Sequence, residues 1–587
     1  MKKYFKMINF YIYEILYLVI IECFNQYLIR TTIEINIDNI KTAVIFDIIW
    51  TIIFVIILYI MKPKLRKIIA TIFNILILII SIGNYFMYSY FSNIISFKDI
   101  FLTGDGVSFI SSIYKFINLK LILFVLVCID MIILILKTKT EYYYKIKSLQ
   151  TVIIVIILSL LITSKVITKN KYLSNTSDGW DSSSVLNNNA NYYNNWIDPV
   201  RLLRINGTYE YLTRDFYISF LKKDNVISAY NEVNDYINNF KLKKEESNYN
   251  GIFKGKNVIY VMMESMDDYL VNDRVTPTMY EMMQHGFNFI NHYSPGYVTG
   301  DTANTEFIAN TGIYPNINKL SPNYAYVENS YPFAIANLFK DNGYVTNSFH
   351  RSYGYIYNRS KMHISLGYNN YHNYSDMGIS DENLDLDTYI IKDGYDKIIN
   401  NDLFFSFIIT YSPHSPYTYD KIECQTNLNE IKEIYPLLED EELLCSYSAA
   451  RETDNMFKLL LENLEKDNLL DDTIIVAFSD HPNHLLVRED ETELLNKTIF
   501  FIYDRNMDKN EINTITSSVN ILPTVINLFG IETNYIYPGY DALNYNNGYV
   551  IFKDYTYYDG KNINNLTKEM YDDIKYSANL LVSNYYK

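Results

Sequence analysis

The chain has 587 residues, a length that suggests several structural units, and its apolar residues are concentrated near the N-terminus. Its formal net charge of −15 argues against a nucleic-acid partner, because phosphate binding requires a basic face. The four cysteines are few. Cys23 and Cys128 fall in apolar segments, while Cys424 and Cys445 either pair or remain free thiols, since sequence does not show whether their Cβ atoms meet.

The N-terminal part contains five apolar segments, each close to the ~20 residues needed to cross a bilayer. We predict membrane spans at 8–29, 42–61, 68–90, 120–136 and 148–168. No small-residue cleavage site follows the first segment, which is therefore expected to remain as an anchor. Four acidic residues fall within the segments, where the alternatives are a functional role or simple pairing between helices and placement near the interfaces: Glu14, Glu22, Asp47 and Asp130.

Lysine and arginine residues set the expected orientation. They gather at the N-terminus and in the second and fourth loops, which we therefore predict to face the cytoplasm. Five spans then place everything after about residue 170 outside the cell, whereas one span more or fewer would reverse this. Residues 96–119, in the third loop, are expected to form either an amphipathic helix on the outer surface or a plain connector.

Beyond the spans, the composition changes twice. Residues 170–200 are rich in Asn, Ser, Asp and Tyr, as in an exposed linker, and the helical patterns at about 208–245 are expected to pack onto the globular domain that follows. We predict four parts: a five-helix membrane domain at 1–168, an extracellular linker with helices at 169–249, a catalytic domain at 250–565, and a C-terminal tail at 566–587.

The third part alternates short apolar runs with amphipathic stretches, such as 276–286 and 447–469. This order predicts an α/β domain with a mostly parallel sheet covered by helices on both faces. Ligand sites in such sheets lie at the carboxyl ends of the strands. The predicted buried strands are 257–265, 343–349, 404–412, 473–480 and 498–504.

Polar residues lie at the carboxyl ends of two predicted strands, where ligand sites of such sheets occur. Glu264 ends the first predicted strand, and Asp480 and His481 end a later one. Together with Thr302 they offer three oxygen ligands and one imidazole, a set that suits Mn²⁺, Mg²⁺ or Zn²⁺. A hydroxyl bound to such a cation loses its proton more easily and becomes a nucleophile.

Thr302 itself precedes a run, 303–309, that predicts the first turns of a helix. The unpaired N–H groups and positive dipole end of a helix favour a phosphate or an alkoxide. The alternative interpretation is that Thr302 is only a helix cap, since threonine is a preferred cap residue.

Four stretches in order resemble the sulfatase and alkaline phosphatase superfamily, and within it the lipoteichoic acid synthase family of membrane-anchored glycerophosphate transferases. They are VMMES around Glu264, GDTANTEF around Thr302, FHRSYGYIYNRSKMHISLGY from Phe349, and SDH from Ser479. The segment ILPTVINLFGI, 521–531, is similar to the family's closing segment. Five spans followed by an outside catalytic domain fit the family across nearly the whole chain.

The resemblance implies residue roles. Glu264, Thr302, Asp480 and His481 would hold one catalytic Mn²⁺, with Thr302 as the nucleophile. A second group would surround the glycerophosphate: His350, Arg359 and His414. The planar guanidinium of arginine suits two phosphate oxygens, and a histidine suits proton transfer.

The sequence departs from the family pattern at several positions. Ser352 stands where many relatives have an acidic residue, Tyr357 where a tryptophan is expected, and Asn520 where an aspartate precedes Pro-Thr. The expected metal ligands are untouched, so these changes put the acceptor in doubt more than the reaction.

The function that the resemblance implies is a phosphoglycerol transferase of lipoteichoic acid biosynthesis at the outer face of a bacterial cell membrane. Thr302 would attack the phosphate of phosphatidylglycerol, release diacylglycerol, and pass glycerophosphate to a glycolipid or a growing poly(glycerol phosphate) chain. One alternative is a phosphoethanolamine transferase, although those enzymes usually carry several disulfides. Another is a non-catalytic membrane protein that binds lipid headgroups or teichoic polymer. A sulfatase proper is disfavoured, because it requires Cys or Ser at position 302.

Overall fold

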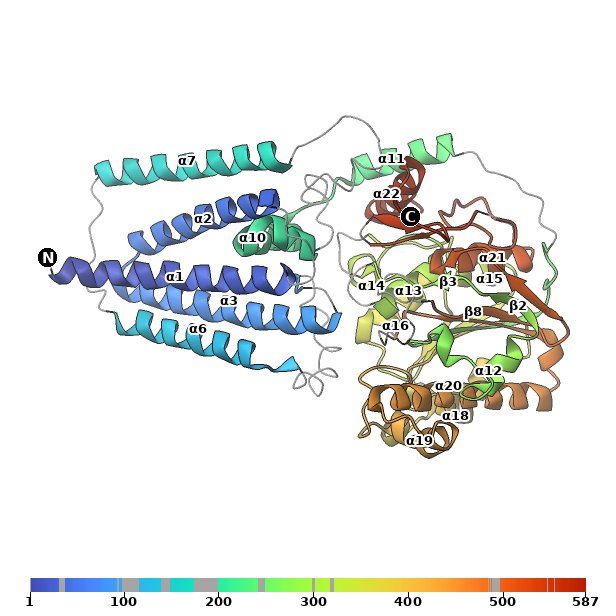
Figure 1. Ribbon diagram of the computed structural model, residues 1–587. Coiled ribbons are helices and arrows are strands. Elements are labelled where there is room, and N and C mark those ends of the chain that lie inside the picture. The colour runs from blue at the N-terminus through green and yellow to red at the C-terminus, as the bar shows by residue number, and fades with distance from the viewer. Residues whose placement is uncertain are drawn as a thin grey trace. The chain divides into compact units, whose positions relative to one another are not determined.

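The computed structural model describes residues 2–30, 37–91, 94–97, 116–138, 148–173, 199–240, 249–297, 301–316, 321–483, 485, 487, 497–545, 547–553 and 555–587. These residues divide between two compact units, 1–223 and 224–587 (Figure 1). The amphipathic helix considered for the third loop falls largely on residues 98–115, which lie outside the described residues.

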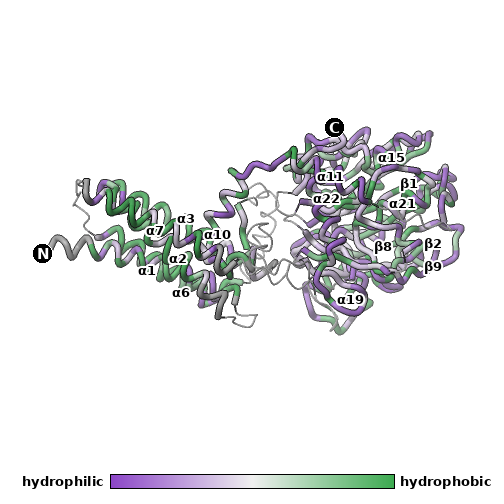
Figure 2. The backbone as a smooth tube through the Cα atoms, turned by 90° about the horizontal axis from the view of Figure 1, so that it is seen from above, coloured by the Kyte–Doolittle hydropathy of each residue, from purple (hydrophilic) through white to green (hydrophobic). Residues whose placement is uncertain are grey.

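The first unit is a bundle of long apolar helices. By length and composition five of them can cross a membrane, with candidate spans at Ile8–Ile29, Thr42–Ile60, Pro63–Ser89, Leu119–Lys137 and Gln150–Lys169. Their apolar character runs along nearly their whole length (Figure 2). The five predicted apolar spans are thus confirmed as helices. They are α1 (Lys2–Arg30), α2 (Ile37–Ile60), α3 (Pro63–Phe91), α6 (Leu119–Lys137) and α7 (Ser148–Leu173).

A further helix of this unit was not expected there. Helix α10 (Pro199–Phe216) packs against α2 and α1, and the residues from Leu202 to Tyr211 are almost all buried (Figure 1). Gly207 breaks α10 with φ 74° and ψ 167°, and a short π-helix, η3 (Tyr217–Leu221), follows it. The expectation that residues 208–245 pack onto the globular domain therefore fails for α10, whose mixed composition concealed that it lies among apolar helices.

The second unit begins with α11 (Val226–Asn239), which packs against the C-terminal helix α22 (Lys568–Ser583). The hydroxyl of Tyr236 in α11 donates a hydrogen bond to the carboxyl of Asp573 in α22. Residues 566–587, expected to form a tail, thus contribute a packed helix to this unit.

The centre of the second unit is an eight-stranded sheet in the order β5-β4-β6-β1-β7-β8-β2-β9. The five strands from β5 to β7 are parallel, β8 is antiparallel to both of its neighbours, and β2 and β9 pair in parallel. The predicted mostly parallel α/β sheet is confirmed. The strands are β1 (Asn257–Met263), β2 (Gly286–Phe289), β4 (Val345–His350), β5 (Asn370–His372), β6 (Phe404–Ile409), β7 (Thr473–Ser479), β8 (Phe500–Tyr503) and β9 (Lys509–Ile512).

Both faces of this sheet are covered, as its alternating side chains show. Val258, Tyr260 and Met262 of β1 belong to one apolar cluster, and Ile259, Val261 and Met263 belong to another on the opposite face. Helices α12 (Pro277–Met282), α18 (Thr388–Ile398) and α20 (Glu441–Lys466) pack into the second cluster. The first receives α13 (Asp301–Thr311), α15 (Ile335–Asp341), α16 (Arg359–Leu366), α21 (Ile521–Leu528) and α22.

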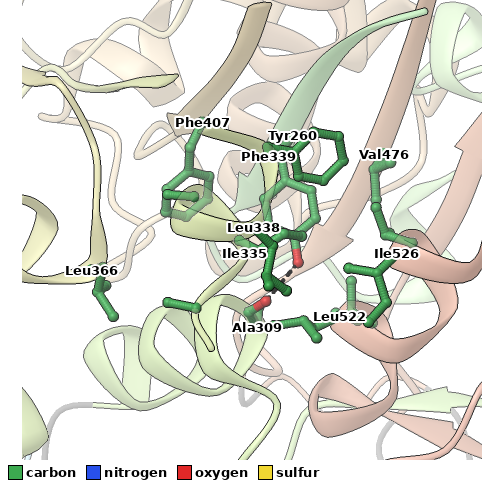
Figure 3. Packing of buried hydrophobic residues seen from close by; sticks show 14 of the residues in the cluster. Tyr260, Ala309, Ile335, Leu338, Phe339, Leu366, Phe407, Val476, Leu522 and Ile526 are labelled. Atoms are coloured by element: carbon green, nitrogen blue, oxygen red, sulfur yellow. Dashed lines mark hydrogen bonds between the residues drawn. The ribbon is translucent and has the colours of Figure 1, made fainter. Parts of the chain in front are cut away.

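Figure 3 shows part of the first cluster. The ring of Tyr260 packs against the rings of Phe405, Phe407 and Phe478, and its hydroxyl donates to the carbonyl oxygen of Ala309 in α13 at 2.9 Å (Figure 3). This bond satisfies the one polar group that the tyrosine buries. It also fastens α13, the helix whose first turn contains Thr302, to strand β1 of the sheet.

The remaining elements are short. They are α14 (Pro322–Ala325), α17 (Tyr374–Met377) and α19 (Ile422–Ile434), with strands β3 (His292–Tyr293), β10 (Thr516–Ser517), β11 (Val550–Ile551), β12 (Thr556–Tyr558) and β13 (Ile563–Asn565). Cys424 in α19 and Cys445 in α20 form a disulfide, which settles the two alternatives left by the sequence.

Candidate functional site

The site begins where two adjacent parallel strands end. β1 and β7 pair in register from Asn257 with Thr473 to Met263 with Ser479, so Glu264 and Asp480 follow the last paired residues. The N–H of Asp480 donates to the carbonyl oxygen of Met263 at 2.9 Å, which holds the two chains together beyond the strands. Both carboxyl side chains are buried, with residue exposures of 3% for Glu264 and 0% for Asp480.

Ser265 connects these two carboxylates. Its hydroxyl donates to Glu264 Oε1 at 2.7 Å, and its N–H donates to Asp480 Oδ1 at 2.8 Å. Ser265 has a φ of 47°, the left-handed region that costs a residue with a Cβ atom about 1–2 kcal/mol. Strain at a buried strand end is typical of functional sites, because the surrounding structure must hold it. Sequence reasoning missed this residue, although its place directly after Glu264 was a usable signal.

His481 and Thr302 complete the group. His481 Nε2 lies 3.4 Å from Glu264 Oε1, 3.5 Å from Asp480 Oδ2 and 3.4 Å from Thr302 Oγ1. One ligand atom from each of Glu264, Asp480 and His481 lies within 4.8 Å of the others. The structure therefore brings together all four residues predicted from the sequence to share a cation.

These residues fit a divalent cation. Asp480 Oδ2 is buried, its nearest basic atom is His481 Nε2 at 3.5 Å, and its carboxyl group lies against that of Glu264, an arrangement that is costly for two carboxylates unless a cation compensates. Burial raises the pKa of Asp480, and the nearby Glu264 carboxylate raises it further. Burial alone would lower the pKa of His481, but Asp480 and Glu264 outweigh it and raise the pKa. A cation at this position would replace the protons that these carboxylates otherwise attract.

Thr302 lies in the first turn of α13, directly after Asp301. It is half-buried, whereas the residues from Ala303 to Thr311 are buried. Thr305, one turn later, donates its hydroxyl to the carbonyl oxygen of Asp480 at 2.5 Å. This bond fixes α13 against the end of β7, so the position of the Thr302 hydroxyl is set by the same segment that carries Asp480 and His481.

Of the three residues expected to bind substrate, His414 lies close to this group, whereas His350 and Arg359 contact other residues. The carboxylate of Asp480 and the imidazole of His481 are near enough to influence the pKa of His414, which burial lowers to about 4. His350 ends β4, and its Nδ1 donates to the carbonyl oxygen of Ile409 at 2.9 Å, leaving Nε2 as the acceptor. Burial and then Arg359 hold the pKa of His350 well below its ordinary value, so the ring is neutral.

Arg359 is buried and paired with an acid that sequence reasoning missed. Glu306 Oε2 accepts from Arg359 Nε at 2.7 Å, and Glu306 Oε1 lies 2.7 Å from His363 Nε2. Burial would raise the pKa of Glu306, but Arg359 and His363 hold it below its usual range. Glu306 follows Thr302 by one turn of α13, a spacing that places both on one face of the helix. The interval between Thr302 and Glu306 within GDTANTEF was the sequence signal that could have identified Glu306.

Two aromatic residues frame the basic groups. The ring of Tyr357, where relatives of the family were expected to have tryptophan, lies 5.4 Å from the Arg359 guanidinium. Tyr411 stacks on His414 at 4.6 Å, and the Arg351 guanidinium lies 3.3 Å from the Tyr411 ring centre. Tyr357 thus keeps a cation–π contact. Asn520, another departure, accepts the N–H of Ser517 at 2.8 Å in a capping box.

Comparison with known proteins agrees with this architecture. The sulfatase family model matches residues 256–531. The lipoteichoic acid synthase of Staphylococcus saprophyticus is 25% identical over 372 residues, covering 57% of this chain and 56% of that protein. The lipoteichoic acid synthase of Staphylococcus aureus is 25% identical over 381 residues, covering 59% of this chain and 58% of that protein. The chain thus aligns with little more than half the length of these curated relatives.

Two solved structures are also similar. The lipoteichoic acid synthase LtaP from Listeria monocytogenes has 22% identity and a TM-score of 0.48, covering 60% of this chain and 96% of that one. The phosphoglycerol transferase GacH from Streptococcus pyogenes, solved with sn-glycerol-1-phosphate, has 18% identity and a TM-score of 0.39, covering 61% of this chain and 91% of that one. The chain thus matches the sulfatase family over residues 256–531 and is similar to curated lipoteichoic acid synthases over little more than half of its length.

Proposed function

We propose that the protein is a metal-dependent phosphoglycerol transferase that moves glycerophosphate from phosphatidylglycerol, through a covalent intermediate on Thr302, to a glycerol hydroxyl of a glycolipid or of a growing poly(glycerol phosphate) chain. One observation carries the proposal: Thr302 Oγ1 lies 3.4 Å from His481 Nε2, beside the buried pair of Glu264 and Asp480. The names of the curated relatives support the choice of reaction class.

The reaction has two displacements at phosphorus. In the first, the Thr302 oxygen bonds to the phosphorus of phosphatidylglycerol, the bond from phosphorus to the diacylglycerol oxygen breaks, and the diacylglycerol leaves with a proton. In the second, the oxygen of the acceptor hydroxyl bonds to phosphorus and loses its proton, the bond from phosphorus to the Thr302 oxygen breaks, and the Thr302 oxygen regains a proton. Each displacement needs a positioned oxygen and compensation of charge on the phosphate more than covalent chemistry.

The residues of the site are suited to separate parts of this reaction. Glu264, Thr302, Asp480 and His481 would hold the cation, for which Mn²⁺ is the first choice and Mg²⁺ and Zn²⁺ are alternatives. When bound, it would lower the pKa of the threonine hydroxyl and offset charge on the phosphate. Arg359 would bind phosphate oxygens. His350, neutral with Nε2 as an acceptor, would take or return the proton, and His414 has the same capacity.

The expected location is outside the cytoplasm, with the helices of residues 1–173 as a multi-pass membrane anchor. The disulfide between Cys424 and Cys445 supports this, because such bonds persist mainly in oxidising compartments. Anchoring suits the chemistry, since donor and acceptor are both held in a membrane and tethering raises their effective concentration.

Purified full-length protein incubated with fluorescent phosphatidylglycerol and Mn²⁺ tests the proposal. We expect diacylglycerol release that Thr302→Ala abolishes and that Thr426→Ala, an exposed threonine in α19, leaves unchanged. The protein should release no diacylglycerol from phosphatidylethanolamine. Equal release from phosphatidylethanolamine would favour a phosphoethanolamine transferase. Retained binding of the lipid without any release by the unaltered protein would favour a non-catalytic binder.

A further inference from the structure

Arg351 has an unused hydrogen-bonding edge. It directly follows His350, the last residue of β4, and its side chain is only 5% exposed. Its Nη1 donates to Asp385 Oδ1 at 2.7 Å. Its Nε and Nη2 are buried and have no hydrogen-bond partner within the part of the chain that the structure describes. Unsatisfied donors of a buried charged group are costly, and native proteins usually satisfy them with a ligand or an ordered water.

The two unpartnered nitrogens serve one ligand because of covalent geometry alone. A guanidinium is planar, and the Nε–H and one N–H of Nη2 lie side by side along one edge and point in the same direction. This edge matches two oxygens of a single phosphate or carboxylate group. The ring of Tyr411, whose centre lies 3.3 Å from the Arg351 guanidinium, supports the plane by a cation–π contact.

The described acids around Arg351 do not occupy this edge. Asp385 accepts only from Nη1, and its side chain is 42% exposed. Asp387 uses its two oxygens for backbone N–H groups of the segment after β6, at 2.7 and 3.1 Å. Glu423 Oε2 is itself buried without a hydrogen-bond partner, so it does not bond to Arg351. Burial raises the pKa of Glu423 to about 7, so its carboxyl group holds a proton more tightly than an ordinary glutamate does.

Arg351 lies near the histidines that are expected to act on the phosphate. The Tyr411 ring that supports the arginine also stacks on the ring of His414 at 4.6 Å. Burial is the main cause of the low pKa of His350 and of His414, and the charge of Arg351 lowers both further. The pKa of His414 also responds to Asp480, so the arginine and the proposed metal site have this histidine as a common neighbour.

The segment after Arg351 is open to solvent and lacks an acid. Tyr353 is 40% exposed and Tyr355 is 72% exposed. Ser352 is half-buried, and it stands where many relatives of the family have an acidic residue. A carboxylate next to the arginine would repel an anion, whereas a serine hydroxyl does not. This departure from the family pattern therefore favours a negatively charged ligand on this side of the site.

We infer that Arg351 forms a second anion subsite, in which its Nε and Nη2 bind two oxygens of a phosphodiester in the acceptor. The inference rests on the proposed function and deepens it, because it selects a glycerol phosphate chain over an uncharged glycolipid as the acceptor. When the terminal glycerol of such a chain attacks, the phosphodiester that joins it to the preceding unit lies one glycerol away from the attacking oxygen. The phosphate of the donor is assigned to a different arginine, Arg359.

Acceptor kinetics of the full-length protein in lipid nanodiscs, with phosphatidylglycerol and Mn²⁺, test this subsite. The charged acceptor is glycerophosphoglycerol, and the uncharged acceptor is a diacylglycerol glucoside. Arg351→Gln should raise KM for glycerophosphoglycerol at least about tenfold, because hydrogen bonds to a charged group are lost. KM for the glucoside and the single-turnover rate of diacylglycerol release, which precedes acceptor binding, should stay unaltered. Lys361→Gln, at an exposed basic residue of α16, is the matched control.

Binding without reaction gives a second measurement. In the Thr302→Ala protein, isothermal titration with glycerophosphoglycerol should give a Kd that Arg351→Gln raises at least about tenfold. Ser352→Asp leaves Arg351 in place and restores an acid beside it, so it should also weaken this binding. The Ser352→Asp result decides the question if the Arg351→Gln protein does not fold.

The outcomes separate this inference from the proposed function. Equal Kd values with and without Arg351→Gln and Ser352→Asp would overturn the subsite, even where diacylglycerol release supports the proposed reaction. A raised KM for phosphatidylglycerol with an unaltered KM for glycerophosphoglycerol would also overturn it and assign Arg351 to the donor. If the unaltered protein releases no diacylglycerol, the proposed function fails, and the titrations still decide whether Arg351 binds a phosphodiester.

Discussion

Glu306 holds Arg359 by a 2.7 Å ion pair between two buried side chains that are 53 positions apart in the sequence. The same carboxylate meets His363 at 2.7 Å with its other oxygen. Because Glu306 lies one turn after Thr302 on α13, this pair links the proposed phosphate-binding arginine to the helix of the proposed nucleophile. A single carboxylate, that of Glu306, therefore fixes the distance between Arg359 and the helix that contains Thr302.

Replacing Glu306 by glutamine keeps the shape of the side chain but removes its charge. We expect kcat for diacylglycerol release to fall by about 10²-fold, because a small displacement of a positioning contact has that effect. Leaving Arg359 unpaired should also lower the free energy of unfolding by roughly 3–5 kcal/mol. Steady-state kinetics and thermal melting of the full-length protein measure both changes.

Two comparisons separate positioning from folding. Glu306→Asp, which keeps the charge on a shorter side chain, should recover part of kcat, and Glu328→Gln at an exposed position should change neither quantity. A folded Glu306→Gln protein with unaltered kcat and KM would show that Arg359 does not need this partner.

Ser265 is expected to control metal affinity without touching the metal. Its hydroxyl and N–H orient Glu264 and Asp480. Loss of such a supporting contact typically lowers metal affinity by about 10–100-fold. Titration of metal-free full-length protein with Mn²⁺ should show that decrease for Ser265→Ala and none for Ser375→Ala, an exposed serine. Identical Mn²⁺ affinities in the two variants would rule out this role of Ser265.

We predict that Asp573 makes the stability of the second unit depend on pH. Burial raises its pKa from the ordinary value of 3.8 to about 7, although the hydroxyl of Tyr236 donates to it. The folded form therefore binds the proton more tightly than the unfolded form. The stabilisation that Asp573 contributes is fully present below about pH 4 and is lost as the pH rises to about 7. The loss is at most roughly 4 kcal/mol, because the folded and unfolded pKa values differ by about three.

The change Asp573→Asn should remove this loss of stability at higher pH. Its melting temperature should exceed that of the unaltered protein at pH 8, and its decline between pH 4 and pH 7 should be smaller. The neighbouring Asp572→Asn change, at a partly exposed residue, serves as the control. Parallel melting profiles for the Asp573→Asn and unaltered proteins would contradict this assignment.

The disulfide gives a stability prediction of its own. Cys424 and Cys445 are separated by 21 positions, and closing a loop of that size contributes about 3 kcal/mol in the chain-entropy model. The double change to alanine should lower the free energy of unfolding by that amount, with Cys23→Ala as the control. Thiol titration of denatured, unreduced protein should find only Cys23 and Cys128. Four reactive thiols would show that the bond does not form.

The parts of the fold that the sequence predicted share one property: a local pattern determines them. β1 and β7 are continuous apolar runs that end in acids, so both the strands and the positions of Glu264 and Asp480 follow from the pattern and from the rule on parallel sheets. Helices α1, α2, α3, α6 and α7 likewise follow from length and hydropathy. The ends of such elements are readable because a change in composition marks them.

The parts that were missed depend on contacts between distant segments. The buried pair of Glu306 and Arg359 joins two helices, and neither residue alone indicates its partner. Helix α10 has a mixed composition that suggests a surface position, yet Glu22 and Asp47 satisfy its broken backbone inside the bundle. Strands β2 and β9 are short and gain their stability from pairing, so no local run of apolar residues announces them.

The covalent intermediate on Thr302 is the central claim, and peptide mass spectrometry of the full-length protein tests it most directly. After reaction with phosphatidylglycerol and Mn²⁺ without acceptor, rapid acid quenching should leave glycerophosphate on the peptide that contains Thr302, and the Thr302→Ala protein should carry none and release no diacylglycerol. Diacylglycerol release by Thr302→Ala at the rate of the unaltered protein, or a glycerophosphate adduct on a different residue, would contradict the account.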